Sequence, residues 1–234
     1  RTLLLRAIFR KFPIGQVPDS YYSYVRGEIS RDTFFRLPEI KDAAEQAAGE
    51  ARCAELGVTP HAVIDGWIGE ALKGCTDWVL IGGPPCQAYS LAGRSRLRPA
   101  NPKAFENDKR HLLYTEYLRI LREFCPSVFV MENVKGMLNS RHQGGRIFER
   151  ILADLSNPRG GLSYQVRSFV APGVDLSPND YVIEAEKFGI PQCRHRVILF
   201  GIRNDLVGLV DDLTKNPQRF LLEKSQEYVG VGIA

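Results

Sequence analysis

The feature that most constrains the fold is a strand–helix–strand pattern between residues 78 and 134. A short apolar run over residues 78–81 stops at Gly-Gly-Pro-Pro, and a second apolar run covers residues 127–131. The segment between them, residues 108–124, has the apolar spacing of an amphipathic helix. Such a helix joins two parallel strands of one sheet. The sequence therefore predicts an α/β fold in which both strands end at the same edge.

A cysteine and a glutamate follow the ends of these two strands. Cys86 comes directly after the Pro-Pro turn, and Glu132 follows the second apolar run. Ligands of open α/β sheets bind outside the carboxyl ends of the strands, so both side chains are expected in one cleft. A thiolate is a strong nucleophile, and a carboxylic acid can pass a proton to a bound base. The alternatives are an inert buried cysteine and an ordinary acid at a helix start, but the pairing of the two residues favours catalysis.

The remaining elements follow from hydrophobic periodicity. We expect helices over residues 3–12, 40–56, 61–72, 108–124 and 146–155, and strands over residues 78–81, 127–131, 164–170, 181–185 and 197–202. The last three strands are expected as an antiparallel addition to a parallel core. Tyr21, Tyr22 and Tyr24 are interpreted as packing residues, with a nucleic-acid platform as the alternative. A length of 234 residues suits one domain, 1–234.

Composition limits the class of protein. No apolar run approaches the roughly 20 residues of a membrane span, and the start lacks a signal peptide, so a cytoplasmic protein is expected with no membrane partner. The five cysteines are odd in number, and no two form a Cys-x-x-Cys pair. This pattern argues against a disulfide framework and against zinc, so no metal site is predicted. A zinc deaminase is excluded because its Pro-Cys-x-x-Cys and His-x-Glu motifs are missing.

Two polar segments are candidates for nucleic-acid contact. The stretch 87–103 is basic and poor in apolar residues, which predicts a phosphate-binding loop beginning at the cysteine. Its candidate DNA-binding residues are Gln87, Ser90, Arg94 and Arg96. Farther on, Gln192, Arg194 and Arg196 alternate, so on an extended segment they point to one side while Cys193 and His195 point to the other. A net charge of +4 permits nucleic-acid binding without demonstrating it.

Three short signatures in this order resemble a known enzyme family. Gly-Gly-Pro-Pro-Cys-Gln, Glu-Asn-Val and Gln-Cys-Arg-His-Arg, beginning at residues 82, 132 and 192, are similar to the catalytic signatures of the DNA (cytosine-5) methyltransferases. The resemblance covers roughly residues 60 to 203. It implies a Rossmann-like, S-adenosylmethionine-dependent methyltransferase core, with a mixed, mostly parallel sheet flanked by helices.

The resemblance also implies roles for single residues. Cys86 would attack carbon 6 of a cytosine flipped out of the duplex, and Glu132 would engage the N3 side of the ring. Arg194 would help to hold the base, while Gln192 and Arg196 would order the site. S-adenosylmethionine would donate the methyl group to carbon 5. The implied cofactor-binding residues are Asp65, Pro84 and Leu113.

The family pattern extends beyond this sequence at both ends. Its glycine-rich cofactor loop is expected before residue 1, and its target-recognition domain after the third signature. We therefore expect a partial catalytic core that is inactive alone and cannot select a DNA sequence. Double-stranded DNA is the expected partner, with a cognate restriction endonuclease in the same restriction-modification system. The alternatives are a related enzyme that methylates cytosine in transfer RNA, and a nucleic-acid-binding module without turnover.

Overall fold

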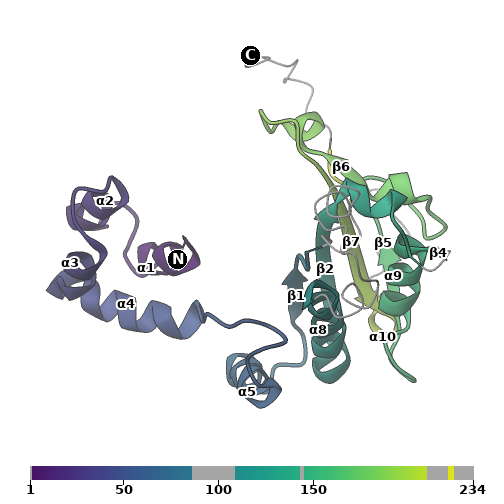
Figure 1. Cartoon of the computed structure of the whole chain (residues 1–234), viewed down its shortest axis with the longest axis horizontal. Coiled ribbons are helices and arrows are strands. Elements are labelled where there is room, and N and C mark those ends of the chain that lie inside the picture. Colours follow the sequence, from purple (N-terminus) through teal and green to yellow (C-terminus); the bar gives the residue numbers. More distant parts are fainter. Residues whose placement is uncertain (1, 86–108, 143–144, 210–220, 224–234) are drawn as a thin grey trace, which may run out of the picture. The chain divides into compact units, whose positions relative to one another are not determined.

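The structure, a computed structural model, describes residues 2–85, 109–142, 145–209 and 221–223 (Figure 1). Its contacts divide the chain into two compact units, Arg1–Glu55 and Leu56–Ala234. Each unit has its own hydrophobic core. The sequence predicted one domain, because nothing in its composition marks the junction near residue 55.

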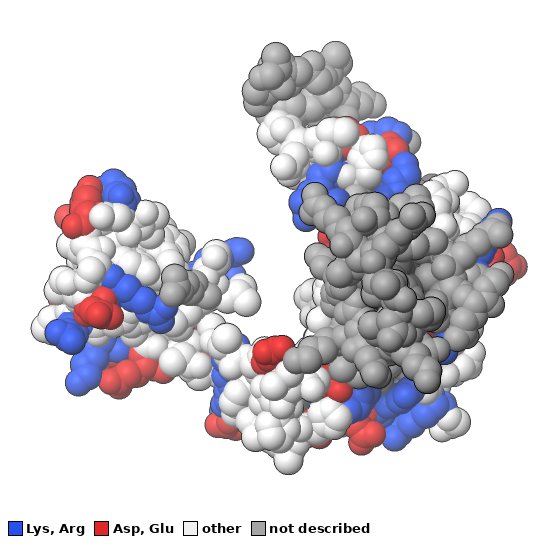
Figure 2. Space-filling model, in the orientation of Figure 1, with Lys and Arg blue, Asp and Glu red and all other residues white. Residues whose placement is uncertain are grey.

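The first unit is helical. Its helices are α1 (Thr2–Phe9), α2 (Asp19–Val25), α3 (Arg31–Arg36) and α4 (Pro38–Glu50). Phe34 is fully buried at its centre, and Tyr24 stacks on Phe34 with ring centroids 4.6 Å apart. Tyr21 is buried in the same core, so two of the three tyrosines pack as expected. On the face seen in Figure 2, acidic and basic side chains of this unit are interspersed rather than gathered into one patch.

The second unit contains a five-stranded mixed sheet. Its strands are β1 (Val79–Gly82), β2 (Val128–Val134), β5 (Tyr164–Arg167), β6 (Val182–Glu184) and β7 (His195–Arg203). The order is β1-β2-β7-β5, and β6 also pairs with β7. β1 and β2 are parallel, while β7 is antiparallel to β2, β5 and β6. Four strands therefore run in one direction, which confirms a mixed, mostly parallel sheet. Of the three strands expected as an antiparallel addition, only β7 opposes β1 and β2.

Helices and short turns complete the second unit. They are α5 (His61–Leu72), α8 (Lys109–Phe124), α9 (Ile147–Ser156), α10 (Asn204–Val207) and the 3-10 turns η1 (Lys135–Asn139), η2 (Pro178–Tyr181) and η3 (Ala185–Phe188), with a small hairpin of β3 (Arg141–His142) and β4 (Gly145–Arg146). The predicted bounds of α5 are confirmed, and those of α8 and α9 agree to within a residue. Among the described residues, no helix has the length and apolar character needed to cross a membrane.

The two faces of the sheet differ. We call the side packed against α8 and α9 the covered face; it carries Leu80, Phe129, Met131, Val166, Val197 and Leu199. The opposite side, the open face, carries Val79, Ile81, Val130, Glu132, Arg196, Ile198 and Phe200, as the strand registers require. Phe129 and Leu199 are fully buried, whereas Ile81 is 76% exposed. The core therefore lies on one side of the sheet.

Two glycines allow close packing on the covered face. A Cβ atom on Gly82 would lie 2.7 Å from the Tyr117 ring, and one on Gly201 would lie 2.1 Å from the Phe129 ring. Both distances are far below van der Waals contact. The strands can approach these aromatic rings only because no side chain is present at either position.

Candidate functional site

The site lies where the parallel strands β1 and β2 end. Crossover helix α8 runs antiparallel to β1, as two contacts demonstrate. The Trp78 indole nitrogen donates to the Phe124 carbonyl oxygen (3.2 Å) before β1 begins, and Tyr117 packs against Gly82 where β1 ends. In the β1–β2 register Gly82 pairs with Met131, which places the Gly-Pro-Pro turn beside Glu132. The predicted convergence of the two strand ends is confirmed.

Glu132 is held by an arginine from the neighbouring strand. Arg196 on β7 donates from Nε to Oε1 of Glu132 at 2.8 Å, and its Nη1 atom donates to the His195 carbonyl oxygen at 2.7 Å. Both side chains lie on the open face, with exposed fractions of 43% for Glu132 and 26% for Arg196. The second oxygen, Oε2, faces Gly83, where a Cβ atom would come within 3.1 Å. The carboxylate is thus fixed by one oxygen, and the missing side chain at Gly83 leaves space at the other.

Asn133 fixes the turn that leads to the cysteine. Its side chain is buried and donates from Nδ2 to the Pro84 carbonyl oxygen at 3.0 Å. Its Oδ1 atom accepts from the Val134 amide at 2.9 Å. Both polar ends of the amide thus bind backbone groups, and the bond from Nδ2 joins the Gly-Pro-Pro turn to β2.

Several predicted residues lie outside the described part of the chain. They are Cys86, Gln87, Ser90, Arg94 and Arg96. The described residues end at Pro85, which directly precedes Cys86. Pro85 follows Pro84, whose carbonyl oxygen accepts the hydrogen bond from Asn133. The proposed nucleophile is therefore attached to a turn whose position beside Glu132 is defined, while its own role stays a prediction.

The third signature is only partly extended. β7 begins at His195, so of the predicted alternating set only Arg196 belongs to the strand. Gln192 and Arg194 are exposed on the preceding turn, where the Arg194 carbonyl accepts from the Ala185 amide. Among the described residues, Arg196 is the member of this set that reaches Glu132. The predicted grouping of Cys193 with His195 is confirmed, since Cys193 Sγ lies 3.7 Å from His195 Nε2. The common direction of the Gln192, Arg194 and Arg196 side chains stays a prediction.

The predicted cofactor residues divide into two kinds. Asp65 on α5 forms an ion pair with Arg119 of α8 at 2.8 Å, and Arg119 also binds Glu116 on its own helix. The Asp65 carboxylate therefore helps to attach α5 to α8. Leu113 lies one helical turn before Tyr117, the residue that packs on Gly82, so it lies on the side of α8 toward Pro84. Pro84 and Leu113 thus lie toward the strand ends, whereas one oxygen of Asp65, Oδ1, is engaged by Arg119; a role of the three residues in cofactor binding stays a prediction.

Sequence reasoning missed the charge network that surrounds Asp65. His61 and Glu116 interact at 2.8 Å, and Glu116 is almost fully buried. The partners are separated by 54 or 55 positions, so no local spacing could have paired them. The available signal was that the acidic Glu116 stands three positions after Leu113 and four before Ile120, within the predicted amphipathic helix.

Burial and nearby charges shift the pKa values of Tyr117 and Cys193. Burial, followed by the nearby Tyr164, raises the pKa of Tyr117, whose hydroxyl donates to the Val130 carbonyl oxygen at 3.3 Å. The negative charge of Glu186 raises the pKa of the Cys193 thiol, with burial as a second cause. Cys193 is therefore not activated as a nucleophile, although it belongs to the third signature.

Comparisons with known proteins agree with the signatures. The model of a family described as C-5 cytosine-specific DNA methylase matches residues 71–230. A Type II methyltransferase of Bacillus paralicheniformis is 40% identical over 128 residues, which are 55% of this chain and 26% of that protein. A Type II methyltransferase of Picosynechococcus is 38% identical over 53% of this chain and 43% of its own length. The matched part of this chain thus spans less than half of either relative.

A solved structure gives a weaker likeness. The Dnmt2 methyltransferase of S. pombe superimposes with a TM-score of 0.38 and 16% sequence identity, over 84% of this chain and 47% of its own.

Proposed function

Because the chain belongs to the C-5 cytosine-specific DNA methylase family, we propose that it is the catalytic core of an enzyme that methylates carbon 5 of cytosine in DNA. One observation carries this proposal in structural terms. The turn before Cys86 and the carboxylate of Glu132 lie side by side at the ends of two parallel strands. A thiol and a carboxylate that start from such neighbouring positions can act on one nucleobase.

The proposed reaction gives roles to Cys86 and Glu132. The Cys86 thiolate adds to carbon 6 of a flipped cytosine, and the electrons of the carbon 5–carbon 6 double bond move into the ring while Glu132 engages its N3 side. S-adenosylmethionine, when bound, would supply the methyl group that carbon 5 takes up and would leave as S-adenosylhomocysteine. Water, acting as a base, then removes the proton from carbon 5. The electrons of that carbon–hydrogen bond re-form the carbon 5–carbon 6 double bond and expel the Cys86 thiolate. Flipping the base costs a few kcal/mol, which a fitted pocket offsets.

Arg196 and Gly83 have proposed supporting roles. The bond from Arg196 to Oε1 holds the carboxylate of Glu132 in one orientation, and the space beside Gly83 leaves Oε2 free to meet a base. Gln192 and Arg194, exposed just before β7, are proposed to contact the base or its phosphates when DNA is bound. Gln87, Ser90, Arg94 and Arg96 are proposed to bind the DNA backbone.

For the cofactor we propose an apolar wall rather than an acidic contact. Pro84 and Leu113 would line the methyl-donor site at the strand ends, because α8 brings Leu113 toward that side. Asp65 forms an ion pair with Arg119, so its proposed role is to join α5 to α8. S-adenosylmethionine is the methyl donor of this family.

A covalent trap tests the mechanism. The natural protein that contains these residues is incubated with S-adenosylmethionine and DNA containing 5-fluorocytosine, whose fluorine cannot leave as a proton does. We expect an adduct that survives denaturation, lost in Cys86→Ser and retained in Cys53→Ser, a variant of an exposed cysteine in the helical unit. DNA binding without any adduct would instead indicate a non-catalytic binding module.

The nucleic acid is tested separately. Transfer of a tritiated methyl group is measured in parallel on double-stranded DNA and on transfer RNA. We expect label in DNA, in agreement with the family description. Label confined to transfer RNA would contradict the proposed substrate while leaving the cysteine chemistry intact. If the enzyme belongs to a restriction-modification system, its methylated DNA is expected to resist a cognate endonuclease.

A further inference from the structure

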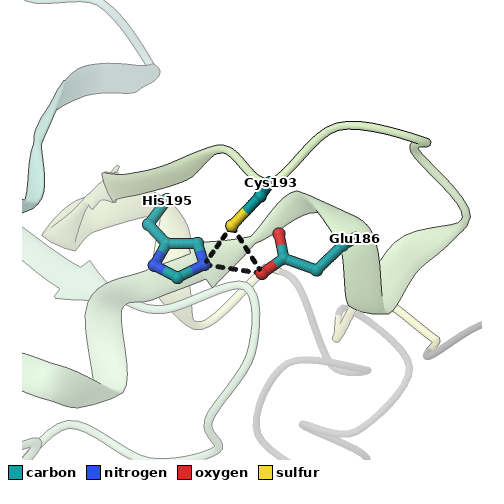
Figure 3. A group of neighbouring side chains, drawn as sticks. All are labelled: Glu186, Cys193 and His195. Atoms are coloured by element: carbon teal, nitrogen blue, oxygen red, sulfur yellow. Dashed lines mark hydrogen bonds and ion pairs between the residues drawn. The ribbon is translucent and has the colours of Figure 1, made fainter. Parts of the chain in front are cut away.

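Three side chains of different chemistry meet beside the start of β7 (Figure 3). Glu186 comes from the 3-10 turn η3, Cys193 from the segment before the strand, and His195 is the first residue of β7. Glu186 Oε1 lies 2.6 Å from His195 Nε2 and 3.6 Å from Cys193 Sγ, and the sulfur lies 3.7 Å from the same ring nitrogen. One oxygen, one sulfur and one nitrogen thus point to a common centre.

These separations are close to those of a tetrahedral metal site. Zinc bonds of about 2.0 Å to nitrogen or oxygen and about 2.3 Å to sulfur place the ligand atoms about 3.3 to 3.5 Å apart. Both distances to the sulfur agree with this geometry to within a few tenths of an ångström. Only the bond between Glu186 and His195 is shorter, and it would open by about 0.7 Å when an ion replaced the shared proton.

The backbone holds the three ligands in place. Glu184 pairs with His195 in the β6–β7 register, and the Ala185 amide donates to the Arg194 carbonyl oxygen at 3.1 Å. The two segments that carry the ligands are therefore joined independently of any ion, so little reorganisation is needed on binding. In addition, Oε2 of Glu186 is buried and accepts no hydrogen bond from the described residues.

We propose that Glu186, Cys193 and His195 bind one zinc ion, with water in the fourth position. Three protein ligands and one open position form an established arrangement for this metal, whose borderline softness suits a thiolate, an imidazole and a carboxylate together. The proposal is independent of the methyl-transfer function. The sequence predicted no metal site because it contains no Cys-x-x-Cys pair, whereas here a Cys-x-His pair combines with a glutamate from another turn.

Zinc at this position would fasten η3 to the beginning of β7. His195 directly precedes Arg196, the residue that holds Glu132, so the ion would stabilise the strand end from which the arginine projects. The expected role is structural. The ion would lie on the opposite side of β7 from the Arg196 side chain, since successive residues of a strand alternate.

Zinc binding to the whole 234-residue chain tests the proposal. After treatment with a chelator, the chain is titrated with zinc in competition with an indicator of known affinity. We expect one tightly bound ion per chain, and at least about a 100-fold loss of affinity in Cys193→Ser and in His195→Ala, because each removes one of three ligands. Cys75→Ser is the matched control, since Cys75 is also exposed but belongs to no such cluster of described residues, and it is expected to bind like the parent.

Cobalt substitution tests the Cys193 sulfur as a ligand directly. A cobalt ion bound to a thiolate gives a sulfur-to-metal charge-transfer absorption, expected in the parent chain and in Cys75→Ser and absent in Cys193→Ser. If Cys193→Ser does not fold, as judged by circular dichroism, Glu186→Gln is measured in its place and is expected to weaken zinc binding while keeping the sulfur band. The absence of a stoichiometric ion, or equal binding by the parent and these variants, would refute the site.

Discussion

The two faces of the same sheet have different tasks. Along β2, Phe129 and Met131 are fully buried against α8 and α9, whereas the alternating neighbour Glu132 projects from the open face to Arg196. Successive residues of a strand point to opposite sides, so one strand supplies both sets. The covered face holds the fold together, and the open face carries the candidate chemistry. Changes on the two faces are therefore expected to affect different measurements.

The energetic contrast follows from burial. Removing a large apolar side chain from water stabilises the fold by about 1.5–3 kcal/mol. An ion pair as accessible as Glu132–Arg196 typically contributes at most about 1 kcal/mol. Stability should thus depend on the covered face, while the open face can be altered without unfolding the protein.

The largest effect is expected from Phe129→Ala. Phe129 is fully buried and contacts the rings of Tyr117 and Tyr164, so the change leaves a cavity and should lower the free energy of unfolding by about 3–5 kcal/mol. The matched change on the open face is Ile81→Thr, which keeps a β-branched side chain at an exposed position and should alter stability by about 0.5 kcal/mol or less. Urea unfolding measures both. Similar losses for the two variants would remove the distinction between the faces.

A second test adds an atom instead of removing several. Gly201→Ala would place a Cβ atom 2.1 Å from the Phe129 ring, so we expect a loss of about 1–3 kcal/mol from overpacking. Gly136→Ala is the control, because nothing lies within 4 Å of a Cβ atom at that position. Combining Gly201→Ala with Phe129→Leu should cost less than the sum of the single changes, since the smaller side chain relieves the clash. If the losses of unfolding free energy were strictly additive, the two side chains would not interact.

Local pattern predicted the parts of this contrast that repeat along the chain. The period of 3.6 residues located α5, α8 and α9, and the two apolar runs located β1 and β2 as the parallel pair of one crossover. Because a crossover aligns strand ends, the meeting of the Gly-Pro-Pro turn with Glu132 also followed from the sequence.

Contacts between distant residues could not be predicted in this way. α2 and α3 have seven and six residues, too few to display a period, and they are held by packing around Phe34. Asp65 is bound to Arg119, 54 positions away. The position at which β7 begins depends on pairing with β2 and β6, so alternation alone could not show that Gln192 and Arg194 precede the strand.

Asn133→Ala tests the connection between the faces at the strand end. The Asn133 side chain is buried and donates to the Pro84 carbonyl oxygen, which would be left without this partner. We expect a loss of about 1–2 kcal/mol in unfolding free energy, together with slower adduct formation on 5-fluorocytosine DNA, because the turn before Cys86 is no longer fixed. Asn139→Ala, at an exposed position, provides the control and should change neither quantity. A stable variant with normal adduct formation would show that the turn keeps its position unaided.

The smallest stability effect and the clearest functional effect are expected together in Arg196→Ala. The Glu132–Arg196 pair is partly exposed, so its loss should change the unfolding free energy by less than about 1 kcal/mol. Methyl transfer should nevertheless fall by about 10- to 100-fold, because Glu132 loses the partner that orients it. Arg167→Ala is the matched control: Arg167 pairs with Phe200 in the sheet register and thus lies on the same face, but its side chain binds Gln165 rather than Glu132. If Arg196→Ala lowered the unfolding free energy in proportion to the loss of methyl transfer, the open face would be part of the structural core. The two faces would then not differ in their roles.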